Sequence, residues 1–138
     1  MKLFLDTNVF LLAIGGAHPE RDACRTLLTR LGNGSLRATT STEVVQELLY
    51  VLRRRGRHEA ALRVARELLH LFPDLLPVTA RVMDRTCAIA EAHPHVPTRD
   101  AVHAATMQVH GLAVVVSTDP HFDAVSGITR LSPSQGVL

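Results

Sequence analysis

Lysine, tryptophan and long apolar runs are scarce or missing in this chain of 138 residues. Lys2 is the only lysine among 15 basic residues, so a mechanism that needs a lysine in the interior of the chain is excluded. Tryptophan is absent and aromatic residues make up 4% of the sequence, which argues against a platform of several rings for stacking bases. No apolar run is long enough for a membrane span or a signal-peptide core, so we expect a cytoplasmic protein with no membrane contact.

Cysteine is also rare, and it gives no sign of a disulfide framework. Cys24 and Cys87 are far apart and fall in helical patterns, so we expect buried free thiols. The net charge of +2 permits nucleic-acid binding without requiring it. The length predicts one domain, residues 1–138, and 46% hydrophobic residues are enough for a folded core.

Strand patterns and helix patterns alternate along the chain. This order predicts an α/β fold with a mainly parallel sheet and right-handed crossovers. We expect strands at residues 2–5, 35–40, 112–116 and 128–131, with a further short strand at 75–78. We expect helices at 8–14, 19–31, from 41 or 42 to about 55, at 58–71, from 79 to about 92, and at 99–110. Thr98 is expected to cap the last helix, 93–97 to be a loop and 132–138 to be a tail.

Four acids occupy positions that such a fold could bring together. Asp6 and Asp119 follow the strands at 2–5 and 112–116, Asp100 opens a helix, and Glu47 lies inside one. Ligands of open parallel sheets bind beyond the carboxyl ends of the strands, so these acids meet if the two strands are neighbours. Clustered carboxylates repel one another, and a divalent metal ion is the usual compensation.

Each acid also has a purely structural interpretation. Asp6 and Asp119 could be turn residues, Asp100 could favour the helix dipole, and Glu47 could lie on a solvated helix face. The joint pattern is more specific than any member. Neighbouring acids compete for two positions, because Glu43 lies one helical turn before Glu47 and Asp123 lies four residues after Asp119.

The acids stand in four short segments of recognisable composition. The segments are Leu3-Phe4-Leu5-Asp6-Thr7-Asn8, Val44-Val45-Gln46-Glu47-Leu48-Leu49, Thr98-Arg99-Asp100-Ala101-Val102-His103-Ala104-Ala105 and Val114-Val115-Val116-Ser117-Thr118-Asp119-Pro120-His121-Phe122. In this order and spacing the chain resembles the PIN-domain ribonucleases of the VapC toxin type. The resemblance implies a three-layer PIN-like fold, with a mainly parallel sheet of four or five strands flanked by helices. It also implies endonucleolytic cleavage of RNA with a metal-activated water.

The resemblance also implies roles for individual residues and for partners. It selects Asp6, Glu47, Asp100 and Asp119 as the catalytic and metal-binding acids, in preference to Glu43 and Asp123. Asp6 and Asp100 would be the main metal-side ligands, Glu47 would hold water or act as a base, and Asp119 would bind directly or through water. The expected cofactor is Mg²⁺ or Mn²⁺. The expected partners are the RNA substrate, an antitoxin protein and a second copy in a homodimer.

Polar residues near the acids and a run of arginines each have two interpretations. Thr7, Asn8, Ser117 and Thr118 could hydrogen-bond waters or a phosphate, and His103 could approach the site or simply be a packed, hydrogen-bonded residue. The arginine run at 53–57 could contact RNA phosphates or be a solvated helix end.

Other families fit less well. Phosphatases of the haloacid dehalogenase type need a second acid at the position of Asn8 and a distal lysine, and response-regulator receivers need that lysine too. The alternative function is a PIN-like module that binds RNA or protein without cutting.

Overall fold

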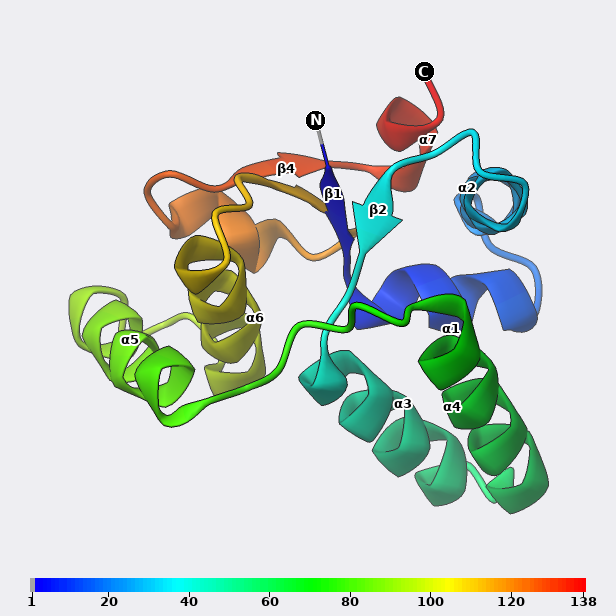
Figure 1. The fold of residues 1–138 in the computed structure, drawn as a ribbon, viewed down its shortest axis with the longest axis horizontal. Helices are drawn as coiled ribbons and strands as arrows, with labels where there is room; N and C mark the ends of the chain where they lie inside the picture. Colours follow the sequence, from blue (N-terminus) through cyan, green and yellow to red (C-terminus); the bar gives the residue numbers. More distant parts are fainter. Residues whose placement is uncertain (1) are drawn as a thin grey trace.

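The computed structural model describes residues 2–138, and the elements follow one another largely as the sequence predicts (Figure 1). In chain order they are β1 (Leu3–Leu5), α1 (Thr7–Ile14), α2 (Arg21–Gly32), β2 (Ala38–Thr39), α3 (Thr42–Arg54), α4 (His58–Leu71), α5 (Ala80–Ala92), α6 (Thr98–Val109), β3 (Val114–Val116), the short 3₁₀ helix η1 (Pro120–Ala124), β4 (Thr129–Leu131) and α7 (Pro133–Gly136).

The four strands form one parallel sheet in the order β2-β1-β3-β4. Leu5 of β1 is paired with Val116 of β3, so the two strands end side by side. The strands are short and entirely apolar where they are central, and the side chains of Phe4 and Val115 have no exposed surface. This confirms the predicted α/β fold and the predicted neighbourhood of the first and the third strand.

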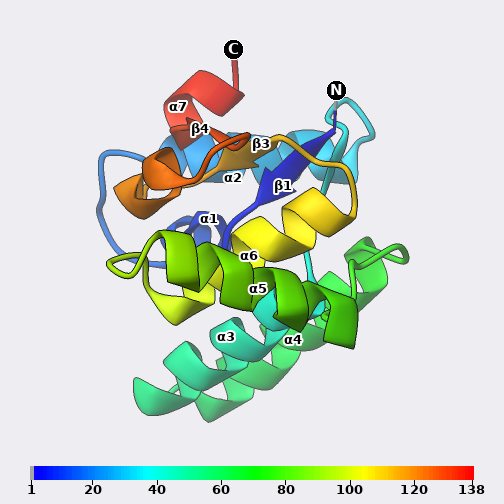
Figure 2. The ribbon, with the colours of Figure 1, turned by 90° about the vertical axis from the view of Figure 1, so that its left-hand side faces the viewer.

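Helices cover both faces of the sheet and extend beyond one end of it. Figure 1 shows α5 and α6 on one side and α1 and α2 on the other, while the α3–α4 hairpin projects past the carboxyl ends of β1 and β2. Figure 2, turned by 90°, shows α5 outside α6 with the same hairpin below them. Helix α3 contacts both α1 and α6, so the helices from the two faces of the sheet are joined through it.

Polar caps explain where three of the helices begin. Ser41 accepts a hydrogen bond from the backbone of Val44, which identifies the cap of α3 from the two candidates in the sequence. Thr79 caps α5 by accepting from the backbone of Val82. Asp6 caps α1 through the backbone N–H of Thr7, so this acid fixes the direction of the chain as it leaves the sheet.

Three local predictions are wrong. Thr98 is the first residue of α6 rather than its cap, because the extended residue before the helix is Pro97, which has no side-chain acceptor. Residues 75–78 form no strand, and only Leu76 pairs with Ser41 in an isolated bridge. Residues 132–138 are not simply a tail, because Ser132 and Gln135 form a capping box that starts α7.

The remaining expectations concern the thiols, the loop at 93–97 and membranes. Both cysteines are free, but only Cys24 is buried, and Cys87 is exposed on α5. Residues 93–97 form the expected connection between α5 and α6. Within residues 2–138, no helix has the length and apolar character needed to cross a membrane.

Candidate active site

Asp6 stands at the point where β1 passes into α1, and its carboxylate ties two elements together. Oδ1 accepts from the backbone N–H of Thr7 at 2.8 Å, and Oδ2 accepts from Ser117 Oγ at 2.6 Å. Ser117 directly follows β3, so this bond joins the ends of the two central strands. Burial raises the pKa of Asp6 above its ordinary value, while the charge of His103 and the bond from Ser117 oppose that rise.

Glu47 reaches the same place from the second turn of α3. Its Oε1 accepts from Thr7 Oγ1 at 2.8 Å and lies 3.0 Å from His103 Nε2, while Oε2 lies 3.4 Å from a guanidinium nitrogen of Arg99. Burial would raise the pKa of Glu47, but the bonds from His103 and Thr7 outweigh it and hold the pKa below its ordinary value. Glu47 is therefore held as a carboxylate.

His103 lies between two of the acids, on the buried face of α6. Its side chain has no exposed surface, and Nε2 is 3.6 Å from Asp6 Oδ1 as well as 3.0 Å from Glu47 Oε1. Burial works to lower the pKa of His103, yet the hydrogen bond that Nε2 donates to Glu47 and the nearby negative charges raise it. These contacts favour the protonated, positively charged form of the ring in this half of the site. The sequence left two interpretations open, and His103 is both packed and in contact with the acids.

Asp100 and Asp119 form the other half of the site with a third residue, His121. Asp119 caps η1, accepting from the backbone N–H of His121 at 2.9 Å, and the His121 ring folds back so that Nδ1 is 2.6 Å from Asp119 Oδ1. His121 Nδ1 is also 3.6 Å from Asp100 Oδ2. One potential ligand atom from each of the three residues lies within 4.8 Å of the others.

The two carboxyl groups of this half are strongly coupled. Burial, followed by the neighbouring Asp119 carboxylate, raises the pKa of Asp100 to about 8. Burial acts on Asp119 in the same direction, but the bond from Asp100 and those from His121 hold its pKa below the ordinary value. Without a cation, Asp100 therefore keeps a proton and shares it with Asp119.

Ser117 connects the two halves. Its Oγ donates to Asp6 and accepts from the backbone N–H of Asp119 at 2.9 Å and from Asn8 Nδ2 at 3.3 Å. Asn8 Oδ1 in turn accepts from the backbone N–H of Thr118 at 3.4 Å. The sequence left open whether these polar residues contact waters or a phosphate, and in the structure they hydrogen-bond one another and the acids.

The structure thus brings all four predicted acids to the same end of the sheet, with one difference from the expectation. Asp6 was expected to be a main metal-side ligand with Asp100. Within residues 2–138, the atoms close enough to hold one ion come from Asp100, Asp119 and His121, whereas Asp6 and Glu47 meet at His103. The sequence did not single out His121. Its signal is the Asp-Pro-His spacing, because an aspartate that starts a turn accepts the backbone N–H two residues later and so brings that residue close.

The two rival acids have different surroundings. Asp123 forms two hydrogen bonds of 3.0 Å with Arg130, outside the group around Asp100. Glu43 lies on the same face of α3 as Glu47 and lines a surface hollow with it. Burial raises the pKa of Glu43. Glu43 is thus a neighbour of the site, and Asp123 is bound to an arginine beside it.

The donor set suits a divalent cation. Asp100 Oδ2 is buried and has no hydrogen-bond partner within the part of the chain that the structure describes. An unpartnered buried carboxylate oxygen is costly unless a cation faces it. Carboxylate oxygens are typical ligands of Mg²⁺ and Mn²⁺, and an imidazole is a common ligand of divalent transition-metal ions. The residues present therefore fit a metal.

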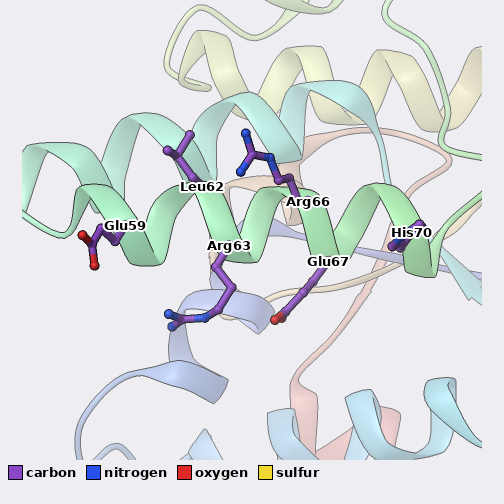
Figure 3. A pocket seen from close by; sticks show the side chains of 6 residues that line it. All are labelled: Glu59, Leu62, Arg63, Arg66, Glu67 and His70. Atoms are coloured by element: carbon purple, nitrogen blue, oxygen red, sulfur yellow. The ribbon is translucent and has the colours of Figure 1, made fainter.

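A hollow on the surface of α4 is separate from this site. Figure 3 shows it along the outer face of α4, and none of the four acids lines it. Its lining residues are Glu59, Leu62, Arg63, Arg66, Glu67 and His70. Because all six come from one helix surface, the hollow lacks the convergence of polar groups found at the end of the sheet.

The family model of the PIN domain matches residues 3–128. Ribonuclease VapC7 of Mycobacterium tuberculosis is 33% identical over 132 residues, covering 95% of this chain and 91% of that protein. Ribonuclease VapC23 of the same organism is 32% identical over 117 residues, covering 85% of this chain and 92% of that protein.

Solved structures are similar in fold. The crystal structure of VapC20 from Mycobacterium tuberculosis, described as a sarcin-ricin loop cleaving toxin, has a TM-score of 0.77 at 23% identity, covering 95% of this chain and 99% of that one. DNA-bound VapBC from Salmonella typhimurium has a TM-score of 0.72 at 20% identity, covering 96% of this chain and 98% of that one. At these identities the likeness shows the fold alone.

Proposed function

Because this chain belongs to the PIN domain family and is related along most of its length to VapC ribonucleases, we propose that it is an endoribonuclease toxin. It hydrolyses phosphodiester bonds of RNA and is restrained by an antitoxin protein. The observation that carries this proposal is the convergence of Asp6, Glu47, Asp100 and Asp119 at the carboxyl end of a parallel sheet.

We propose that Asp100 and Asp119 hold a divalent ion, Mg²⁺ or Mn²⁺, together with the ring of His121. Such an ion lowers the pKa of a water molecule and offsets the charge that builds up on the phosphodiester. Thr7 and Ser117 already bond to the oxygens of Asp6, so a metal contact from Asp6 uses a lone pair that those bonds leave free.

The other residues position groups and move a proton. Thr7 and His103 hold Glu47 as a carboxylate through Oε1, which leaves Oε2 towards Arg99 and the surface. Glu47 Oε2 is the proposed acceptor for the proton of the attacking water. Ser117 and Asn8 fix the positions of Asp6 and the Asp119 backbone, so the acids need little rearrangement before reaction.

The proposal extends to assembly and location. We propose that residues 1–138 form a single domain, that the chain works as a homodimer with its antitoxin, and that it acts in the cytoplasm, where its RNA substrate is found. The antitoxin is supported by the similarity to VapC and VapBC proteins and not by a particular contact in this chain. The dimer rests on the resemblance to the family alone.

The test is an RNA cleavage assay with Mg²⁺ or Mn²⁺ added and then chelated. We expect cleavage only with the ion, and loss of at least about a hundredfold in rate for Asp100→Asn, because an amide cannot replace the charged ligand. Asp123→Asn is the matched control, since this acid pairs with Arg130, and it should cleave like the wild type. Equal cleavage by wild type and Asp100→Asn would refute the nuclease proposal, and RNA binding without any cleavage would favour the silent binding module.

The toxin role needs a separate experiment. Expression of the wild-type chain alone should arrest bacterial growth, and expression of Asp100→Asn at the same protein level should not. Unchanged growth at confirmed expression of the wild type would contradict the toxin role without bearing on cleavage in vitro.

A further inference from the structure

Two adjoining hollows run along α3, away from the acids. Glu47, Tyr50 and Arg99 line the first, together with Glu43 and Gln46. Tyr50 and Arg99 also line the second, which continues to Val51, Arg54 and Arg55. Because two side chains are common to both, the surface is continuous from a candidate catalytic acid to the arginines at the end of the helix.

Helix geometry sets the spacing along this surface. Glu47, Tyr50 and Arg54 are three and then four residues apart, so they lie on one face of α3. Seven residues of helix separate the acid from the arginine, a distance of about 10 Å. Figure 1 shows α3 projecting beyond the sheet, so this face continues outward from the site.

Tyr50 is the only tyrosine of the chain, and its side chain is exposed to solvent. The residue is 48% exposed. Arg54 packs over the ring, with the guanidinium carbon 5.7 Å from the ring centroid, and donates a hydrogen bond of 3.0 Å to the phenol oxygen. A large exposed aromatic ring beside a guanidinium group is a ready partner for an unpaired base.

Charge distinguishes the two ends of this surface. Among the described residues no carboxylate forms a salt bridge with Arg54 or Arg55, although Arg99 pairs with Glu47. Both arginines are exposed, and Arg54 is bonded only to the uncharged phenol of Tyr50. Guanidinium groups whose charge no carboxylate offsets favour phosphate oxygens. The outer end of this surface therefore suits the phosphates of an RNA strand.

We propose that the RNA strand next to the cleavage site lies along α3, with one base stacked on Tyr50 and phosphates paired with Arg54 and Arg55. The inference rests on the proposed nuclease function and names the path of its substrate. It is compatible with the low aromatic content of the chain, because one base needs one ring and not a platform of several.

The test measures binding of a short fluorescein-labelled single-stranded RNA of mixed sequence, by fluorescence anisotropy, to the inactive Asp100→Asn protein over a range of salt concentrations. Tyr50→Ala, added to that background, should weaken binding about 5- to 140-fold, the range for loss of one base–ring stack. Tyr50→Phe should bind like the parent, because the ring remains. Arg54→Ala and Arg55→Ala should each reduce the slope of log K against log salt by about 0.7, as expected for one lost phosphate contact.

The matched controls are Arg63→Ala and Arg66→Ala, exposed arginines of the separate hollow on α4 (Figure 3). Both should leave the affinity and the salt slope unchanged. If Tyr50→Ala and Arg54→Ala bind RNA like the parent, or no more weakly than the α4 controls, the inference is overturned. It is also overturned if these variants leave RNA affinity unchanged but alter the sedimentation of the protein without RNA. The surface would then be an interface between two copies of the chain.

Cleavage by the active chain separates the two proposals. Wild type that cleaves RNA, with Tyr50→Ala binding and cutting equally well, refutes the path along α3 and leaves the nuclease intact. Wild type that never cleaves but binds RNA through Tyr50 and Arg54 refutes the nuclease and supports the path.

Discussion

Asp100→Asn should stabilise the metal-free protein while abolishing cleavage. Asp100 is buried beside Asp119 and has an oxygen without a hydrogen-bond partner. An asparagine of almost the same volume has no charge to bury, and its amide can donate to the Asp119 carboxylate in place of the shared proton. The residue proposed to hold the ion is therefore also a source of instability when no ion is present.

The size of the effect follows from the pKa of Asp100, which burial and Asp119 raise from 3.8 to about 8. Above pH 8 a shift of about four units corresponds to at most about 6 kcal/mol. Water that reaches the partly exposed Asp119 screens its repulsion of Asp100, so we expect a smaller effect of about 1–3 kcal/mol. With an unfolding entropy of about 0.3 kcal/mol/K for a chain of this length, Tm should rise by about 3–10 °C.

The pH dependence has a definite sign. In the wild type, the folded state holds the Asp100 proton more tightly than the unfolded state, so this group favours folding least at high pH. Stability of the wild type relative to Asp100→Asn should therefore fall from about pH 4 to about pH 8 and then level off. The gain from the substitution should be small near pH 5 and full near pH 9.

The assay is thermal unfolding followed by circular dichroism in chelator, at both pH values, with Asp123→Asn as an exposed control. Adding Mn²⁺ or Mg²⁺ should then raise the Tm of the wild type and leave that of Asp100→Asn unchanged. The reasoning is refuted if Asp100→Asn lowers Tm near pH 9, or raises it equally at both pH values.

Three further predictions concern single side chains. His103→Ala should lower the free energy of unfolding by about 2–4 kcal/mol in urea titration, because it leaves Asp6 and Glu47 without their shared cation, and a loss below about 0.5 kcal/mol would contradict this. His121→Ala should leave the Tm nearly unchanged, since the ring is half exposed, yet weaken Mn²⁺ binding in calorimetry by about tenfold or more; unchanged metal affinity would remove His121 from the site. Ser132→Ala should cost about 1 kcal/mol in thermal unfolding by removing the capping box of α7, and no measurable cost would mean that this helix adds nothing to stability.

The sequence predicts the part of the site that depends on strand direction. Asp6 and Asp119 each follow a strand, and parallel strands end at one edge, so their approach needed only that β1 and β3 be neighbours. The composition of the four segments then selected Glu47, which lies among apolar helix residues. The fold is confirmed; the catalytic roles of these acids stay predictions.

The sequence fails where a side chain folds back over a short distance or where long-range contacts decide. His121 joins the site through a turn of two residues that no periodicity reveals. His103 looks like one more buried residue of α6 until α3 and β1 are packed against it. Likewise the strand expected at 75–78 has the right residues, but only Leu76 lies within reach of a partner.

Asp6 and Asp100 differ in their hydrogen bonds, and this affects how mutations inactivate such a toxin in a growing population. Asp6 starts α1 and ties β1 to the end of β3, so its replacement weakens the fold and exposes the chain to proteolysis. Asp100 carries no comparable bond, so its replacement leaves an abundant, well-folded and harmless chain. That chain would still bind the antitoxin. In a cell that also carries an active copy of the toxin, less antitoxin would be left to restrain the active copy. Such a cell would be less protected from the toxin than a cell that had lost the mutant gene entirely.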